Sequence, residues 1–293
     1  MSLTVKDYLE KVEKVRDLPT LPAIFTELAN MLSDTNSSVH DVEHLMESDQ
    51  SLTMRVLKVA NSAYYRVSDR VTNIGEAVNY LGFDKLKKVA LSSSILSIFK
   101  GRTVTAFDIN SFWKHGVGVA VASGTIAKYV GMEEHETPYV CGLVHDIGKI
   151  VNYMLDAETF IEVAQYALDK KIDLVAAEKS QDYPRHDVLG YYVCKHWKLS
   201  KYILATVGHH HQENVDARAI KSEQLNRVID VVIVANKITH DRKFGFSGHS
   251  SSTLPSPEIL ERVGIPPADL PRVVEMIEQE WKSAEGILKV LES

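Results

Sequence analysis

The chain has 293 residues, of which 45% are hydrophobic and 25% are charged, an ordinary composition for a globular protein of one large or two small domains. Its formal net charge of -6 at pH 7 provides no overall basic field, which argues against nucleic-acid binding. The longest uncharged run of small residues, 116–127, has 12 residues and is too short for the roughly 20 that span a bilayer, so no membrane segment is expected.

Two features of the sequence indicate a cytoplasmic protein. The first residues include Asp7, Glu10 and Glu13, whereas a secretory signal has a basic region followed by an apolar stretch. The two cysteines, Cys141 and Cys194, lie far apart within apolar helical patterns, which is typical of buried free thiols in a reducing compartment. We therefore expect no disulfide.

The first hundred residues predict a helical lobe, 1–106. Apolar residues at a spacing close to 3.6 predict a helix over 3–16. Pro22 suits the first turn of a second helix that runs to about Leu32. The cluster 34–37 ends this helix, Gly82 ends a later one, and 101–106 would form a hinge. The further helices expected in this lobe are 38–46, 51–65, 74–81 and 84–99.

The rest of the chain predicts a second helical lobe, 108–242, followed by a loop and a C-terminal helical segment, 258–293. Valine and isoleucine within 228–235 favour strands, yet the pattern around them favours a helix. Glycine, serine and proline in 243–257 indicate a flexible loop or linker. The helices expected are 108–130, 139–155, 158–171, 174–180, 186–197, 200–211, 222–241 and 268–291. The predicted fold class is all-α, a multi-helix bundle.

Polar groups within the apolar run 143–149 mark a candidate site. Burying this run would place His145, Asp146 and Lys149 where they need partners. If 139–155 is one helix, Lys149 lies four residues after His145 and three after Asp146, so the three side chains converge on one side. The arrangement indicates a metal and phosphate site.

A subset of the 12 histidines falls on the helices that should meet around this run. Imidazole-rich sites with a carboxylate suit iron, manganese, zinc, cobalt or nickel better than magnesium or calcium. The plainer alternatives are an exposed helix end for His210 and His211, and a solvated surface lysine for Lys149. The candidate ligands are His115, His145, Asp146, His186, His210 and His211.

This composition favours metal-assisted hydrolysis. Asp146 has two oxygens and can bridge two ions. His145 and Asp146 can reach the same ion either where a helix bends or through their different side-chain lengths. A metal lowers the pKa of bound water to about 7 and holds phosphoryl oxygens. A nearby ammonium such as that of Lys149 would neutralise developing negative charge.

Several short motifs follow one another along the chain. They are LPTLP at 18–22, VANSAYY at 59–65, AVNYLG at 77–82, FWKH at 112–115 and GLVHDIGK at 142–149, then His186 with Gly190, Trp197 with Leu199, and His210 with His211. In this order they resemble the HDOD domain family, a relative of the HD-domain phosphohydrolases and the HD-GYP phosphodiesterases. The resemblance covers residues 18–213.

The resemblance implies an N-terminal helical lobe packed on an HD-like lobe, and a role in bacterial signalling and regulation. By position, the six candidate ligands look like the dinuclear metal ligands of HD-GYP enzymes, and Lys149 looks like their phosphate-side lysine. The sequence departs from that pattern twice. Asn236, which we include among the predicted metal residues as a weaker, neutral ligand, stands where catalytic relatives have an aspartate. No Gly-Tyr-Pro signature comes after His211.

The residues and the resemblance together support two hypotheses for function. In the first, the protein is an HDOD regulatory module that engages a signalling protein partner, and its metal or nucleotide site is structural or sensory. In the second, it is a metal-dependent phosphohydrolase or phosphodiesterase in which Asp146 and Lys149 act in catalysis on a nucleotide or phosphodiester. The sequence leaves open whether it is an enzyme, and which of iron, manganese, zinc or nickel it binds.

Overall fold

The computed structural model describes residues 23–33, 38–47, 49–62, 71–98, 108–248 and 253–292. Helices supply the regular structure and no strand occurs in these ranges, which confirms the predicted all-α fold class. None of the helices in the same ranges has the length and apolarity needed to cross a membrane. The helix predicted over 3–16 and the hinge predicted at 101–106 lie outside the described residues.

The described residues fall into two compact units. The larger lies within Thr103–Glu278, and the smaller lies within Pro19–Arg102 and Gln279–Ser293. The division therefore passes through the last helix, α17 (Leu270–Glu292). All of the predicted metal ligands belong to the larger unit.

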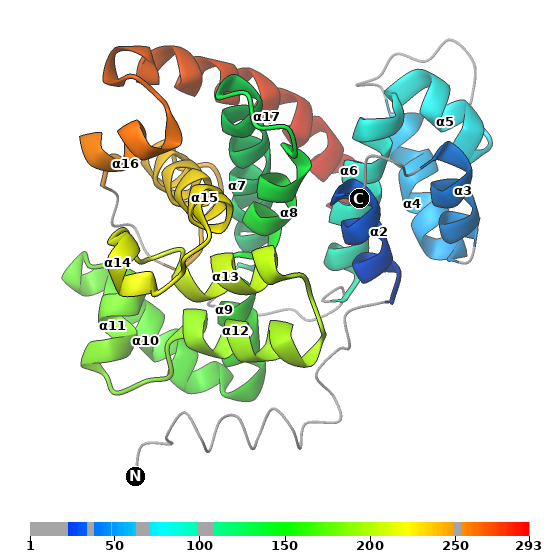
Figure 1. The fold of residues 1–293 in the computed structure, drawn as a ribbon. Coiled ribbons are helices and arrows are strands. Elements are labelled where there is room, and N and C mark those ends of the chain that lie inside the picture. The colour runs from blue at the N-terminus through cyan, green and yellow to red at the C-terminus, as the bar shows by residue number, and fades with distance from the viewer. Residues whose placement is uncertain are drawn as a thin grey trace. The chain divides into compact units, whose positions relative to one another are not determined.

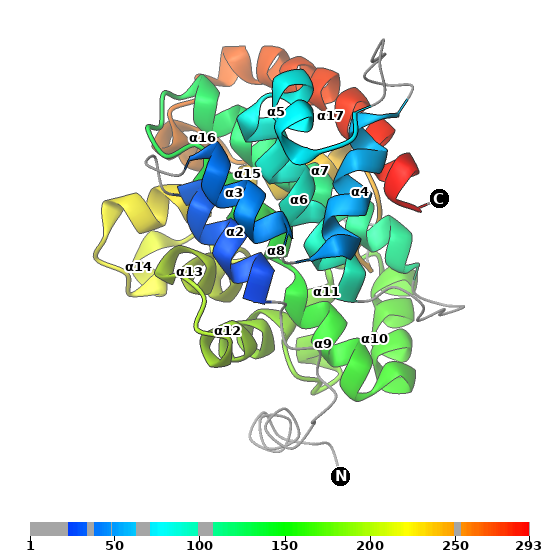
Figure 2. The same ribbon diagram turned by 90° about the vertical axis from the view of Figure 1, so that its right-hand side faces the viewer.

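The smaller unit is organised around α6. Figure 2 shows α6 with α2 on one side and α4 on the other, and both helices pack against it. Asn61, at the end of α4, donates to the carbonyl of Val71 (2.7 Å) and accepts from its N–H (2.8 Å), which joins α4 to the start of α5. The helices are α2 (Ala23–Ser33), α3 (Val39–Glu47), α4 (Gln50–Ala60), α5 (Ile74–Leu81) and α6 (Phe83–Ile98).

The larger unit is built on α7 (Ile109–Tyr129), whose length is buried between α8 and α15 (Figure 1). Residues 228–235 of α15 are buried, and this confirms the predicted helix because tertiary packing overrides the strand preference of its valines and isoleucines. The other helices are α8 (Glu136–Val144), α9 (Ile147–Leu155), α10 (Ala157–Lys170), α11 (Leu174–Ser180), α12 (His186–His196), α13 (Lys201–His209), α14 (Val215–Arg218), α15 (Glu223–Asp241), α16 (Pro257–Val263) and the short η1 (Pro267–Asp269).

The prediction of a single helix over 139–155 is wrong, because the helix is interrupted between α8 and α9. His145 and Asp146 form a turn there, and the ring of His145 bonds through Nδ1 to the carbonyl of Gly142 (2.8 Å). At Gly148 a Cβ would lie 1.8 Å from the carbonyl oxygen of His186, so only glycine allows α9 to approach the start of α12 this closely. Because of this interruption, the side chains of His145 and Asp146 lie side by side, with Nε2 of His145 3.4 Å from the carboxylate of Asp146.

Candidate metal centre

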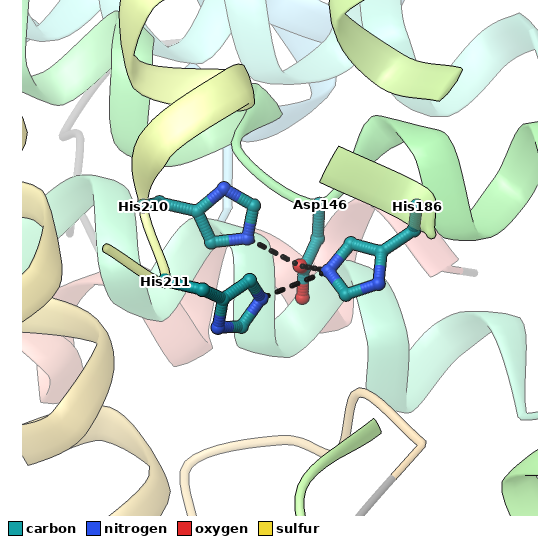
Figure 3. Close-up of side chains that lie close together, drawn as sticks. All are labelled: Asp146, His186, His210 and His211. Atoms are coloured by element: carbon teal, nitrogen blue, oxygen red, sulfur yellow. Dashed lines mark hydrogen bonds and ion pairs between the residues drawn. The ribbon is translucent and has the colours of Figure 1, made fainter. Parts of the chain in front are cut away.

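The structure brings the six candidate ligands together in two groups that share one carboxylate. In each group the potential ligand atoms lie within 4.8 Å of one another. Figure 3 shows the rings of His186, His210 and His211 around the carboxylate of Asp146. The first group is Asp146, His186, His210 and His211, and the second is His115, His145 and Asp146.

The six ligands come from four places in the fold. His115 lies in α7, and His186 is the first residue of α12. His210 is the C-cap of α13, with His211 directly after it. His145 and Asp146 occupy the break between α8 and α9. Because all of them except the half-buried His211 are buried, the helix crossings and not solvent exposure decide where these side chains lie.

Hydrogen bonds through Nδ1 orient three of the imidazoles. Nδ1 of His145 bonds to the carbonyl of Gly142 (2.8 Å), and Nδ1 of His210 bonds to the carbonyl of Val207 (2.9 Å). Nδ1 of His186 bonds to the carboxylate of Glu178 (2.9 Å). We assign the proton to Nδ1 in each case, since a carbonyl or carboxylate only accepts, and in the neutral ring Nε2 is then a bare acceptor.

The three Nε2 atoms point at the two oxygens of Asp146. They lie 3.3 Å (His186), 3.3 Å (His210) and 3.4 Å (His145) from its carboxylate. Within the described residues, Nε2 of His145, Nε2 of His210 and Oδ1 of Asp146 have no hydrogen-bond partner. Buried unpaired polar atoms cost about 1–3 kcal/mol each. A cation between the lone pairs would satisfy all of them, so this His/Asp cluster fits a metal ion.

Burial and charge hold three of the histidines and the aspartate in their metal-ligating forms. Burial lowers the pKa of His210 to about 4, and it lowers the pKa values of His115 and His211 well below the usual range. Burial alone would raise the pKa of Asp146, but His145 and Lys149 lower it well below its usual range. The histidines named here are therefore neutral, and the aspartate is ionised, near pH 7.

Lys149 is buried, which rules out a solvated surface lysine. Its side chain is 1% exposed, and Nζ donates to Oδ2 of Asp146 (2.7 Å). It also donates to the carbonyl (3.0 Å) and hydroxyl (3.2 Å) of Ser247. The ammonium therefore lies beside the carboxylate that the two groups share.

Asn236, the remaining predicted metal residue, lies beside the second group. Its Oδ1 is 3.0 Å from Nε2 of His115, and its side chain is buried in α15. An amide oxygen accepts, so we assign the Nε2 proton to His115 in this pairing. The side chain of Asn236 therefore lies within hydrogen-bond distance of a candidate metal ligand.

Glu178 is a site residue that the sequence alone did not reveal. It is fully buried in α11, and its carboxylate accepts both from the backbone N–H of His186 (3.1 Å) and from the ring. Burial by itself would lower the pKa of His186, but Glu178 raises it to about 9. Without metal this ring is therefore protonated near pH 7, and a metal ion that binds Nε2 must displace its proton. No histidine or aspartate motif surrounds Glu178 in the sequence, so nothing local signals its role.

A buried ion network supports the turn that comes after His211. Arg218 donates to the carbonyl of Gln212 (2.7 Å), and Arg262 donates to that of Glu213 (3.0 Å). Both guanidinium groups also bond to the buried carboxylate of Asp230, in α15. This network ties α14, α15 and α16 to the chain segment that carries two of the ligands.

We predict that Glu178→Gln lowers the affinity of the centre for Mn²⁺ by about 10- to 100-fold, because carboxylate partners of metal-bound histidines orient the ring and raise its basicity. Titration against a chelator of known affinity measures this change. Glu162→Gln, at an exposed carboxylate of α10, is the matched control and should behave as wild type. Unchanged affinity in Glu178→Gln would show that His186 needs no such partner.

Known proteins resemble this chain in sequence. The HDOD domain model matches residues 18–213 of the chain. An uncharacterised protein of Treponema pallidum (strain Nichols) is 23% identical over 202 residues, which is 68% of this chain and 38% of that protein. The uncharacterised protein YuxH of Bacillus subtilis (strain 168) is 35% identical over 72 residues, 25% of this chain and 18% of YuxH. The chain therefore spans well under half the length of either relative.

Solved structures share the fold along nearly the whole chain. An HDOD domain protein of unknown function from Geobacter sulfurreducens is 26% identical, with a TM-score of 0.77 and coverage of 98% of this chain and 96% of that one. A candidate phosphohydrolase from Shewanella amazonensis SB2B is 23% identical, with a TM-score of 0.70 and coverage of 97% of both chains. A candidate signal transduction protein from Marinobacter aquaeolei VT8 is 16% identical, with a TM-score of 0.81 and coverage of 98% and 66%.

Proposed function

Because the chain belongs to the HDOD domain family, we propose that it is a bacterial signalling and regulatory module built around a dinuclear metal centre. The observation that carries the proposal is the position of Asp146, whose carboxylate belongs to both ligand groups. Its two oxygens face different imidazoles: Oδ1 faces His186 and His210, and Oδ2 faces His145. The donor set suits iron, manganese, zinc or nickel.

In this proposal the chain holds the two ions and orients what approaches them. A divalent ion bound there would polarise phosphoryl oxygens and make water more acidic. Asp146 would hold both ions, the imidazoles would complete each site, and Lys149 would keep the shared carboxylate ionised through its 2.7 Å contact. The helical surfaces would report the state of this centre to a signalling protein partner.

Two features favour regulation over turnover. Asn236 offers a neutral amide at the position where catalytic relatives have an aspartate, and amides are weaker metal ligands than carboxylates. The chain also lacks a Gly-Tyr-Pro signature after His211. Both features reduce the support for hydrolysis of a cyclic dinucleotide.

The alternative function is a metal-dependent phosphohydrolase or phosphodiesterase, and the proximity of Lys149 to Asp146 supports it. It predicts hydrolysis of bis(4-nitrophenyl) phosphate or a nucleotide in the presence of Mn²⁺ or Fe²⁺, and loss of that turnover in Asp146→Ala. Inactivity of metal-loaded protein towards these substrates would leave regulation as the function.

Asn236→Asp tests whether this position is that of a lost ligand. We expect the affinity of the second group for Mn²⁺ to rise about 10-fold or more, because a carboxylate replaces an amide beside His115. Isothermal titration calorimetry with Mn²⁺ measures this affinity. Asn110→Asp adds the same charge at an exposed position of α7 and should leave the affinity unchanged. An equal effect of both variants would mean that charge alone, and not ligation, explains the gain.

A further inference from the structure

The ammonium of Lys149 has no donor left for a ligand. An ammonium offers three N–H donors and no acceptor. Nζ lies within hydrogen-bond distance of three oxygens, namely Oδ2 of Asp146 (2.7 Å), the carbonyl of Ser247 (3.0 Å) and the hydroxyl of Ser247 (3.2 Å). The side chain is 1% exposed. A phosphoryl oxygen could bond to Lys149 only by displacing one of these oxygens. Because Asp146 is the carboxylate that both ligand groups share, the oxygens of Ser247 are the ones that can be displaced without loss of a metal ligand.

Ser247 belongs to residues 244–248, which we call the strap and which come after α15. The sequence predicts a flexible loop over 243–257, and the strap has no helix, yet Phe244 and Ser247 are buried. The N–H of Phe246 donates to the carbonyl of Ser111 (2.9 Å). The ring of Phe244 fills the space beside Gly118, where a Cβ would lie 2.5 Å from it. These contacts hold the strap against α7.

Gly245 allows the strap to pass directly over a metal ligand. Its φ of +78° favours glycine, and a Cβ there would lie 2.2 Å from the backbone nitrogen of His115 and 2.6 Å from the carbonyl oxygen of Ser111. The hydroxyl of Ser247 lies 3.4 Å from Nε2 of His240, whose ring is 4.4 Å from that of His115. The strap therefore contacts the centre both at Lys149 and beside the second group.

We propose that the strap occupies the place of a phosphoryl ligand at Lys149. Ser247 then controls whether the centre binds a phosphoryl group, in a phosphate monoester or in a diester, at all. This inference rests on the proposed function and gives it a mechanism of control. Two oxygens of Ser247 take the donors that two oxygens of a phosphoryl group would need. The centre can hold its metal while the strap is in place, but it binds a phosphoryl group only when the strap leaves.

The test uses the full chain loaded with Mn²⁺, and inorganic phosphate as the probe. Gly245→Ala should force the strap away from His115, because the atoms that its Cβ meets belong to the backbone and cannot yield. We expect phosphate to bind at least about 10-fold more tightly, with faster hydrogen exchange at the amide of residue 246 and unchanged metal content. Ser247→Ala removes one of the two acceptors and should give a smaller gain in the same direction.

Gly264→Ala is the matched control. Its φ is +94° and no atom lies within 4 Å of the added Cβ, so it carries the same backbone strain without the contact. It should bind phosphate as wild type does. If residue 246 exchanges faster but phosphate binds no more tightly, or if residue 246 exchanges at the wild-type rate in folded Gly245→Ala, the proposal is wrong.

Two further outcomes distinguish failure of the strap proposal from failure of the proposed function. If Gly245→Ala does not fold, wild-type phosphate affinity in metal-loaded Ser247→Ala overturns the proposal. Metal content is measured on every sample. Absence of metal from the wild type contradicts the proposed function, whereas normal metal content without any gain in phosphate affinity contradicts only the role of the strap.

Discussion

Asp146→Ala is expected to remove the metal from both ligand groups at once. Its carboxylate is the one side chain that the two groups share, and it is 3% exposed, so solvent cannot replace it easily. We expect the metal content to fall from about two ions per chain to near zero. Loss of one partner also leaves Lys149 with only Ser247 to accept its hydrogen bonds.

Variants that lack a single histidine test whether the two ligand groups bind separate ions. His210→Ala should weaken only the first group and His115→Ala only the second, because neither imidazole belongs to both. Asp216→Ala, at an exposed carboxylate of α14, controls for the change in net charge. Elemental analysis gives the metal content, and circular dichroism verifies that each variant is folded. Retention of one ion by Asp146→Ala would mean that the groups do not depend on a common carboxylate.

Gly148→Ala is expected to destabilise the larger unit by about 3 kcal/mol or more and to reduce metal binding with it. The added Cβ would lie 1.8 Å from the carbonyl oxygen of His186 and 2.9 Å from the nitrogen of Gly190. Both are backbone atoms, so no side chain can move aside and α9 must separate from α12. Since His186 is the first residue of α12, separation moves this ligand away from Asp146.

Gly124→Ala is the matched control for this substitution. Gly124 also lies inside a buried helix, α7, but its added Cβ would make only ordinary contacts, the nearest at 3.5 Å from the ring of Tyr139. Replacing a helical glycine by alanine stabilises by about 0.5–1 kcal/mol when there is space. Urea unfolding followed by circular dichroism measures both changes. If Gly148→Ala were as stable as Gly124→Ala, the close approach of α9 and α12 would not be a requirement of the fold.

The helices were largely predictable because their apolar residues recur at the helical period and their ends carry capping residues. Ser200 and Ser222 each cap the helix expected after them, and Asn73 caps α5. The strand preference of the residues within 228–235 was a local signal that packing against α7 overrode.

The site was predictable as a set of residues but not as an arrangement. The types and order of the ligands indicated a metal centre, and the structure places all six of them together. A bend at His145 and Asp146 was one of two alternatives in the sequence, which could not decide between them because the break depends on contact between Gly148 and the backbone of His186, a residue distant in the sequence. The burial of Ser247 and Glu178 depends in the same way on tertiary neighbours.

Elemental analysis of tag-free protein, per chain and beside a His145→Ala control, tests the central claim most directly. A dinuclear centre bridged by Asp146 predicts about two transition-metal ions per wild-type chain. It also predicts loss of the ion held by the second group in His145→Ala, because that group would keep only His115 and Asp146. Absence of bound transition metal from the wild type, after purification in buffer supplemented with Mn²⁺, would contradict the claim.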